Sequence, residues 1–221
     1  MFIVLVPYRA RRDQQFRRNE LISMLANVKQ YFTKNNIEYK IIICEQNDNN
    51  KFNRGILLNI AFLEGEKLGS NKYFHMNTDY LFDLTRSFPN EILDFSNGFL
   101  DLHRPPYPVL GAACVFDSDS YKTINGFPND LVGWGGDDWA IYYRILKKNI
   151  CVLTPTNLFN SGFILETRYD FITDQSNNEK NQSLGLRDDI DTNGINSCNY
   201  TIDTFGEFND GDTVFHFLVS I

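Results

Sequence analysis

The chain has 221 residues, 43% of them hydrophobic, which is enough to bury a full core as a single domain. Its formal net charge of −7 excludes a protein that binds nucleic acid nonspecifically through a basic surface. We find neither the pattern of a secretory leader nor an apolar run long enough to span a bilayer in these residues, so we expect a cytoplasmic protein with no membrane span and no nucleic-acid partner.

Strand and helix patterns alternate along the first half of the chain. An apolar run over residues 3–6 predicts a strand, and helical periodicity follows from about residue 12 to residue 35. A second strand is predicted at 39–44, a second helix at 52–68 and a third strand at 72–76. Short buried strands that alternate with helices predict a mostly parallel sheet of the α/β class.

The cysteines indicate a reduced protein rather than a metal or disulfide framework. They lie far apart in the sequence, with no C-x-x-C spacing. Cys44 and Cys114 end or interrupt apolar runs and are predicted to be small core residues. We therefore expect free thiols and no zinc site.

Polar residues follow each of the three predicted strands, where ligands bind in such a sheet. Arg9, Arg11 and Arg12 follow the first strand and concentrate positive charge in an otherwise acidic chain, which predicts an anion site. The alternative is a solvated helix start, although positive charge opposes the dipole at a helix N-terminus. The three polar segments are Pro7-Tyr8-Arg9, Glu45-Gln46-Asn47 and Asn77-Thr78-Asp79.

Two adjacent carboxylates, Asp137 and Asp138, follow a glycine-rich turn and precede a predicted helix at 140–147. The helix dipole favours their ionised form, and Trp134 offers a flat apolar platform on which a sugar can stack. An ionised carboxylate beside such a platform suits a general base that acts on a sugar hydroxyl. The alternative is a Gly-Gly turn followed by acids that cap the helix. Further on, about 175–199 has the composition of a long loop or lid.

Five blocks of the sequence carry a shared pattern, at 6–11, 52–59, 123–129, 133–138 and 193–197. Together they resemble the β-1,4-galactosyltransferases, the inverting GT-A enzymes of glycosyltransferase family 7. The resemblance covers about residues 3–221. It implies one GT-A (nucleotide-diphospho-sugar transferase) domain over 1–221, with a Rossmann-like, mostly parallel central sheet flanked by helices. A nucleotide-sugar-binding half would span about 1–110, and an acceptor-binding half with a mobile loop about 111–221.

The resemblance implies an enzyme of glycan biosynthesis and carbohydrate metabolism. It would transfer a hexose or N-acetylhexosamine from a UDP-sugar to a glycan or glycoconjugate acceptor and form a β-glycosidic bond. Asp138 would be the general base and Asp137 a ligand of the acceptor hydroxyl. Residues that would bind substrate are Pro7, Tyr8, Arg9, Arg11, Phe52, Arg54, Asn77, Thr78, Val109, Trp134, Gly135 and Gly136. At Val109 the family commonly has Tyr, or Ile or Leu where N-acetyl sugars are accepted, so this smaller side chain predicts room for such donors.

The metal half of the site departs from the family pattern. The usual Asp-x-Asp motif is Asn77-Thr78-Asp79 here, and the positions of the family's Met-x-x-His pair are Ile164 and Thr167. Of the usual ligands only Asp79 remains, with His75 as a second candidate. Three interpretations stay open: a weakly held Mn²⁺ or Mg²⁺ at Asp79, a metal-independent enzyme whose arginines or His75 stabilise the diphosphate, and a homologue that binds UDP-sugar or glycan without turnover. A more distant alternative is a transferase acting on protein or lipid-linked glycan.

Overall fold

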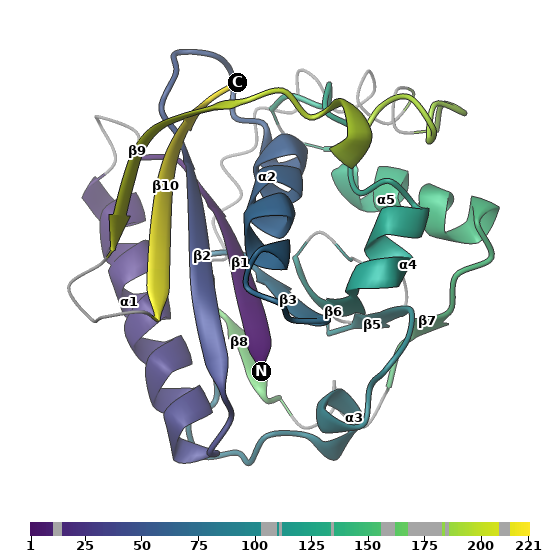
Figure 1. Ribbon diagram of the computed structural model, residues 1–221. Coiled ribbons are helices and arrows are strands. Elements are labelled where there is room, and N and C mark those ends of the chain that lie inside the picture. Colours follow the sequence, from purple (N-terminus) through teal and green to yellow (C-terminus); the bar gives the residue numbers. More distant parts are fainter. Residues whose placement is uncertain are drawn as a thin grey trace.

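The computed structural model describes residues 1–10, 15–102, 110, 112–133, 135–155, 162–167, 183, 186–207 and 213–221. An eight-stranded mixed sheet in the order β7-β5-β6-β3-β1-β2-β10-β9 forms its centre (Figure 1). Four of the pairings in this sheet are parallel and three are antiparallel. The strands are β1 (Phe2–Tyr8), β2 (Tyr39–Gln46), β3 (Lys72–Met76), β5 (Phe99–Asp101), β6 (Ala113–Asp117), β7 (Val152–Leu153), β9 (Thr201–Glu207) and β10 (Val214–Ser220).

Helices cover both faces of this sheet (Figure 1). Alternate residues of β1 point to opposite faces, because the side chains of a strand have a period of two. Val4 and Val6 pack in the core with α1, whereas Ile3 and Leu5 pack in the core with α2, α4 and α5. The helices are α1 (Gln15–Lys34), α2 (Arg54–Glu66), α3 (Asn90–Leu93), α4 (Ser118–Thr123) and α5 (Asp137–Lys147), with a short 3₁₀ helix, η2 (Ile195–Ser197).

The three predicted N-terminal strands and the two predicted helices between them are confirmed, with small shifts at their ends. Cys44 and Cys114 are free and buried, as expected for core residues. The sequence did not indicate β9, nor the two-stranded sheet of β4 (Tyr80–Phe82) and β8 (Ile164–Glu166). Over the part of the chain that the structure describes, no helix is both long enough and apolar enough to cross a membrane.

Candidate active site

The carboxyl ends of β1, β2 and β3 form one edge of the sheet. Tyr8 pairs with Glu45 in the parallel register of β1 and β2, and Leu5 pairs with His75 in that of β1 and β3. Asn77 follows β3 directly, and its backbone N–H donates to the carbonyl of Ala112 at 3.2 Å. The polar segments after the three strands therefore lie along the edge where ligands bind in parallel α/β sheets.

A glycine turn sets the direction of α5 from this edge. Gly133, Gly135 and Gly136 have φ angles of 80°, 93° and 90°, a left-handed region that glycine adopts without the cost that a Cβ brings. Gly136 is the N-cap of α5, so Asp137 and Asp138 occupy its first turn, where the dipole favours negative charge. The turn thus places both acids at a helix N-terminus, as the sequence predicted.

Arg54, at the start of α2, binds both carboxylates at once. Its Nε donates to Oδ2 of Asp137 at 2.8 Å, and its Nη2 donates to Oδ1 of Asp138 at 3.1 Å. The side chain of Asp137 is 9% exposed, whereas that of Asp138 is 38% exposed. Asp138 is therefore the member of the pair that a ligand can reach.

The charges of this triad determine which groups stay ionised. Burial raises the pKa of Asp137, the charge of Arg54 opposes the rise, and the neighbouring Asp138 adds to it. Burial works against the charge of Arg54, but the two carboxylates outweigh it and raise the pKa of Arg54 above its usual value. One guanidinium can balance only one of two negative charges, and Asp138 is the more exposed of the two acids.

The blocks that carried the resemblance contact one another. The backbone N–H of Gly133 donates to the carbonyl of Phe52 at 2.7 Å, and Nδ2 of Asn53 donates to the carbonyl of Asn129 at 2.6 Å. Nδ2 of Asn59 donates to the carbonyl of Phe127 at 2.8 Å. These contacts hold the start of α2 against the glycine turn, and so they position Arg54 beneath the two acids.

Arg9 connects two loops at the same edge. Its guanidinium donates to the carbonyl of Asp48 at 3.1 Å and to the carbonyl of Asn50. The hydroxyl of Tyr8 is buried and has no hydrogen-bond partner among the described residues. Both side chains lie where a uridine diphosphate is predicted to bind, but Arg9 is already engaged with the backbone. The predicted site residues Arg11, Val109 and Trp134 lie outside the described residues.

The predicted metal positions come together, but their side chains do not fit a cation site. The backbone N–H and the hydroxyl of Thr167 donate to the carbonyl of Asp79 at 2.8 and 2.9 Å. The position predicted for the family's metal-binding histidine is therefore adjacent to Asp79. Ile164 pairs with Phe82. Asp79 contributes the one carboxylate of this set. Across the described ranges, no group of three or more His, Cys, Asp or Glu side chains could hold a metal ion.

His75 does not open to the ligand edge. It is 1% exposed, and its Nε2 lies 3.3 Å from Oδ1 of Asn77. Burial, and after it the charge of Arg54, lowers the pKa of His75 to about 3, against the hydrogen bond to Asn77. The imidazole is therefore neutral, and it lies behind Asn77.

Tyr80 is a site residue that the sequence did not indicate. Burial raises its pKa, and so do the carboxylates of Glu166, Asp79 and Asp138, in that order. Its hydroxyl is therefore close enough to Asp79 and Asp138 to interact with their charges. An aromatic residue directly after the Asn-x-Asp segment was the one available signal.

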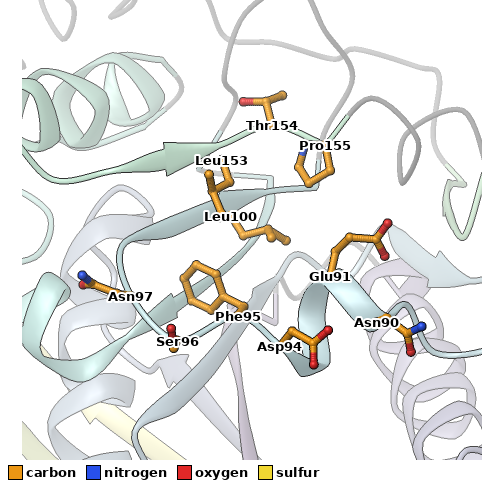
Figure 2. Close-up of a pocket in the computed structure, with 10 residues that line it drawn as sticks. All are labelled: Asn90, Glu91, Asp94, Phe95, Ser96, Asn97, Leu100, Leu153, Thr154 and Pro155. Atoms are coloured by element: carbon orange, nitrogen blue, oxygen red, sulfur yellow. The ribbon is translucent and has the colours of Figure 1, made fainter.

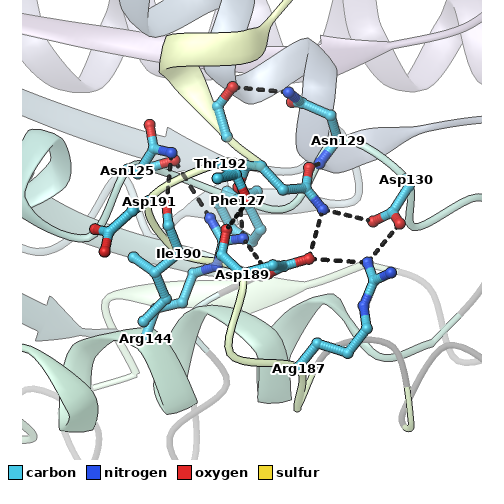
Figure 3. Close-up of polar contacts among 12 residues, drawn as sticks. Asn125, Phe127, Asn129, Asp130, Arg144, Arg187, Asp189, Ile190, Asp191 and Thr192 are labelled. Carbon is cyan, nitrogen blue, oxygen red and sulfur yellow. Dashed lines mark hydrogen bonds and ion pairs between the residues drawn. The ribbon is translucent and has the colours of Figure 1, made fainter.

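A buried arginine fixes the other end of α5 (Figure 3). Arg144, 1% exposed, donates to the carbonyl of Gly126 at 2.9 Å and to the carbonyl of Asn193 at 2.6 Å. It also donates to Oδ1 of Asp189 at 3.1 Å, and Asp189 in turn pairs with Arg187. Residues far apart in sequence are thus tied to the helix that carries the acid pair.

We expect Arg144→Met to lower the free energy of unfolding by at least about 3 kcal/mol, because buried carbonyls lose their donor at a cost of about 1–3 kcal/mol each. Lys148→Met is the matched control. Lys148 lies at the same end of α5, and its ammonium pairs with the exposed Asp191. Loss of such an exposed pair costs less than about 1 kcal/mol. Urea unfolding measures both. Equal losses for the two variants would contradict this role of Arg144.

The structure also has an open pocket of about 710 Å³ between α3 and β7 (Figure 2). It contains none of the residues predicted to bind substrate, and polar and apolar side chains line it together. We therefore do not assign the candidate site to it. Its lining residues are Asn90, Glu91, Asp94, Phe95, Ser96, Asn97, Leu100, Leu153, Thr154 and Pro155.

Two family models match most of the chain. One, described as the N-terminal region of glycosyl transferase group 7, matches residues 1–81. The other, described as the N-terminal domain of galactosyltransferase, matches residues 97–168. Together they include the ends of the first three strands, the acid pair and Thr167.

Curated relatives are named galactosyltransferases. A xylosylprotein 4-beta-galactosyltransferase of Caenorhabditis elegans is 27% identical over 217 residues, which cover 91% of this chain and 71% of the relative. Human beta-1,4-galactosyltransferase 7 is 28% identical over 162 residues, covering 70% of this chain and 46% of the relative. Bovine beta-1,4-galactosyltransferase 1 is 23% identical over 206 residues, covering 90% and 50%. The chain thus spans about half the length of the human and bovine relatives.

A solved structure has the same fold. A mutant of Drosophila beta-1,4-galactosyltransferase 7 in complex with manganese, UDP-Gal and xylobiose superposes with a TM-score of 0.77. The match is 20% identical and covers 100% of this chain and 93% of that one. The fold class predicted from the sequence, GT-A, is confirmed.

Proposed function

The chain belongs to glycosyltransferase group 7, and from this membership we propose that it is an inverting galactosyltransferase-like enzyme. It would transfer a hexose or N-acetylhexosamine from a UDP-sugar to a sugar acceptor. The observation that carries the proposal is the triad at the ligand edge, in which Arg54 holds a buried Asp137 and an accessible Asp138. This pattern differs from a simple helix cap, because a cap needs no arginine between the acids.

The proposed chemistry is a direct displacement. A carboxylate oxygen of Asp138 accepts the proton of the acceptor hydroxyl, and the acceptor oxygen attacks the anomeric carbon. The bond from that carbon to the diphosphate oxygen breaks, UDP leaves with the bonding electrons, and the configuration changes from α to β. The burial of Asp137 supports a role in holding Arg54 more directly than the predicted contact with the acceptor.

The acceptor class is suggested by the relatives. The Caenorhabditis elegans relative is named for a xylosylprotein, and the Drosophila structure holds xylobiose. We therefore propose β-xylosides as the first acceptors to test, in a UDP-release screen with UDP-Gal and parallel EDTA, Mg²⁺ and Mn²⁺ conditions. Acceptor-dependent UDP release supports the proposal, and UDP binding without release under every condition contradicts it.

The second candidate is a homologue that binds UDP-sugar or glycan and has no turnover. The observation that favours it is the side-chain set at 77, 79, 164 and 167, which does not fit a cation site. It predicts UDP binding in the same screen and an Asp138→Asn variant that behaves like the wild type.

We expect the donor pocket to accept N-acetyl donors as well as UDP-Gal. The reason is the small side chain of Val109, at the position that the family resemblance places beside the C2 substituent of the donor sugar. One methylene of space is typically worth about 1–3 kcal/mol of discrimination. The check compares kcat/KM for UDP-Gal, UDP-GalNAc and UDP-GlcNAc in the wild type and in Val109→Tyr. Turnover of UDP-Gal alone by the wild type would refute the expectation.

A further inference from the structure

The end of β3 brings a histidine and an amide into contact, at the position where this chain departs from the family's Asp-x-Asp pattern. Nε2 of the buried His75 lies 3.3 Å from Oδ1 of Asn77. The imidazole packs edge-on against the ring of Phe127, with centroids 6.4 Å apart and planes at 86°. His75 is thus fixed in the core, and Asn77, which is half-buried, stands between it and the ligand edge.

The contact determines which way the amide of Asn77 faces. An amide oxygen only accepts hydrogen bonds, so with Oδ1 as its neighbour Nε2 of His75 carries the proton. The buried Nδ1, which has no hydrogen-bond partner among the described residues, is then the unprotonated nitrogen. With Oδ1 directed to His75, Nδ2 is directed away from it. Within the described ranges, Nδ2 of Asn77 makes no hydrogen bond, so its two N–H groups are available at the ligand edge.

The sign of the charge at this position matters for a diphosphate. A carboxylate there repels an anionic ligand unless a cation lies between them, whereas an amide N–H donates to it directly. Asp79 is the one carboxylate that remains in the set, and Thr167, at the position of the missing histidine, is bound to the backbone of Asp79. The exchange of the other carboxylate for an amide removes a repulsive charge, and the orientation of that amide supplies a donor. Both changes therefore favour binding of a diphosphate without a cation.

We propose that Asn77, oriented by His75, donates a hydrogen bond to the diphosphate of the nucleotide and makes nucleotide binding independent of a divalent cation. This inference rests on the proposed function, since it takes a UDP-sugar as the ligand. Asn77 contacts the ligand, and His75 is a positioning residue that acts through it. In a carboxylate site a cation holds the diphosphate. Here a neutral N–H donor of the protein takes the place of that cation.

The test is calorimetric titration of the folded chain with UDP, in EDTA and in Mn²⁺. We expect the wild-type Kd to differ by less than about threefold between the two conditions, a difference smaller than one hydrogen bond contributes. In Asn77→Asp, we expect UDP affinity in EDTA to fall at least about tenfold, because a donor becomes a negative acceptor, and Mn²⁺ to restore part of it. Asn71→Asp, at the opposite end of β3, makes the same charge change and is expected to leave the Kd unchanged.

Two variants of His75 test its role. His75→Gln keeps an N–H that can reach Oδ1 of Asn77 and is expected to retain the affinity for UDP in EDTA. His75→Leu removes that donor, frees the amide to turn, and is expected to weaken UDP binding by up to about tenfold. The unfolding midpoint of each variant is measured alongside, and if His75→Leu does not fold, Asn77→Asp decides alone.

The outcomes separate this inference from the proposed function. UDP binding by the wild type that requires Mn²⁺, or an Asn77→Asp variant that binds as the wild type does in EDTA, overturns the inference. Cation-independent UDP binding without any turnover supports the inference and contradicts the proposed function. If the wild type binds UDP neither in EDTA nor in Mn²⁺, the inference and the proposed function are both overturned.

Discussion

Asp138→Asn is expected to lower kcat by about 10²–10⁴-fold, the contribution of a well-placed general base. The amide that replaces the carboxylate cannot accept the acceptor's proton, although its oxygen can still bind Nη2 of Arg54. The Kd for UDP should therefore change little, since the lost function belongs to the acceptor side. Single-turnover rates with saturating donor, together with UDP titration, measure the two quantities separately.

Asp94→Asn is the matched control for this prediction. Asp94 is an exposed acid next to α3, outside the triad, and the same substitution there should leave kcat unchanged. If Asp138→Asn keeps the wild-type kcat, Asp138 is not the base. The glycine turn would then be a capped helix start, and the binding homologue would be the better account.

Arg54→Met is expected to have the largest effect on stability among the site variants. It leaves the buried Asp137 beside Asp138 without a counter-charge, and loss of one partner from a buried pair costs about 3–5 kcal/mol. Burial already raises the pKa of Asp137, and the charge of Arg54 opposes this rise, so the pKa should rise further when Arg54 is removed. Urea unfolding measures the loss, and UDP-release assays should show no turnover.

A double variant separates the electrostatic cost from simple misfolding. Arg54→Met with Asp137→Asn removes the unpaired buried charge, and most of the lost stability should return without any return of activity. Arg54→Lys keeps the charge but cannot bind two carboxylates with a planar fork, so it should be intermediate in both readouts. A double variant as unstable as Arg54→Met would contradict the triad's electrostatic role.

The local features of the fold could be predicted from the sequence. The runs at 3–6, 39–44 and 72–76 are mostly apolar because those strands are largely buried on both faces, and that pattern needs no knowledge of the rest of the chain. By contrast, the pairing of Tyr80 with Glu166 joins segments far apart in sequence, and neither segment is long enough to show a period. The strand β9 escaped prediction because only its antiparallel pairing with β10 defines it.

The candidate site was predictable in its parts but not in its connections. The acid pair and Arg54 were named separately, and nothing in their spacing indicated that one arginine binds both acids. The described part of the segment predicted as a long loop, 186–199, is anchored instead by polar contacts to Arg144 and Asn129. Hydrophobic periodicity cannot predict such contacts, because hydrogen bonds rather than apolar burial hold the segment.

The most direct test of the account is acceptor-dependent UDP release by the wild-type chain, with NMR analysis of the product's anomeric configuration. With UDP-Gal and a β-xyloside we expect UDP to be released only when the acceptor is present, and the new bond to be β. Two results would contradict an inverting transferase with Asp138 as its base. One is UDP-Gal that binds but yields no free UDP when the acceptor is present, and the other is a product with an α bond.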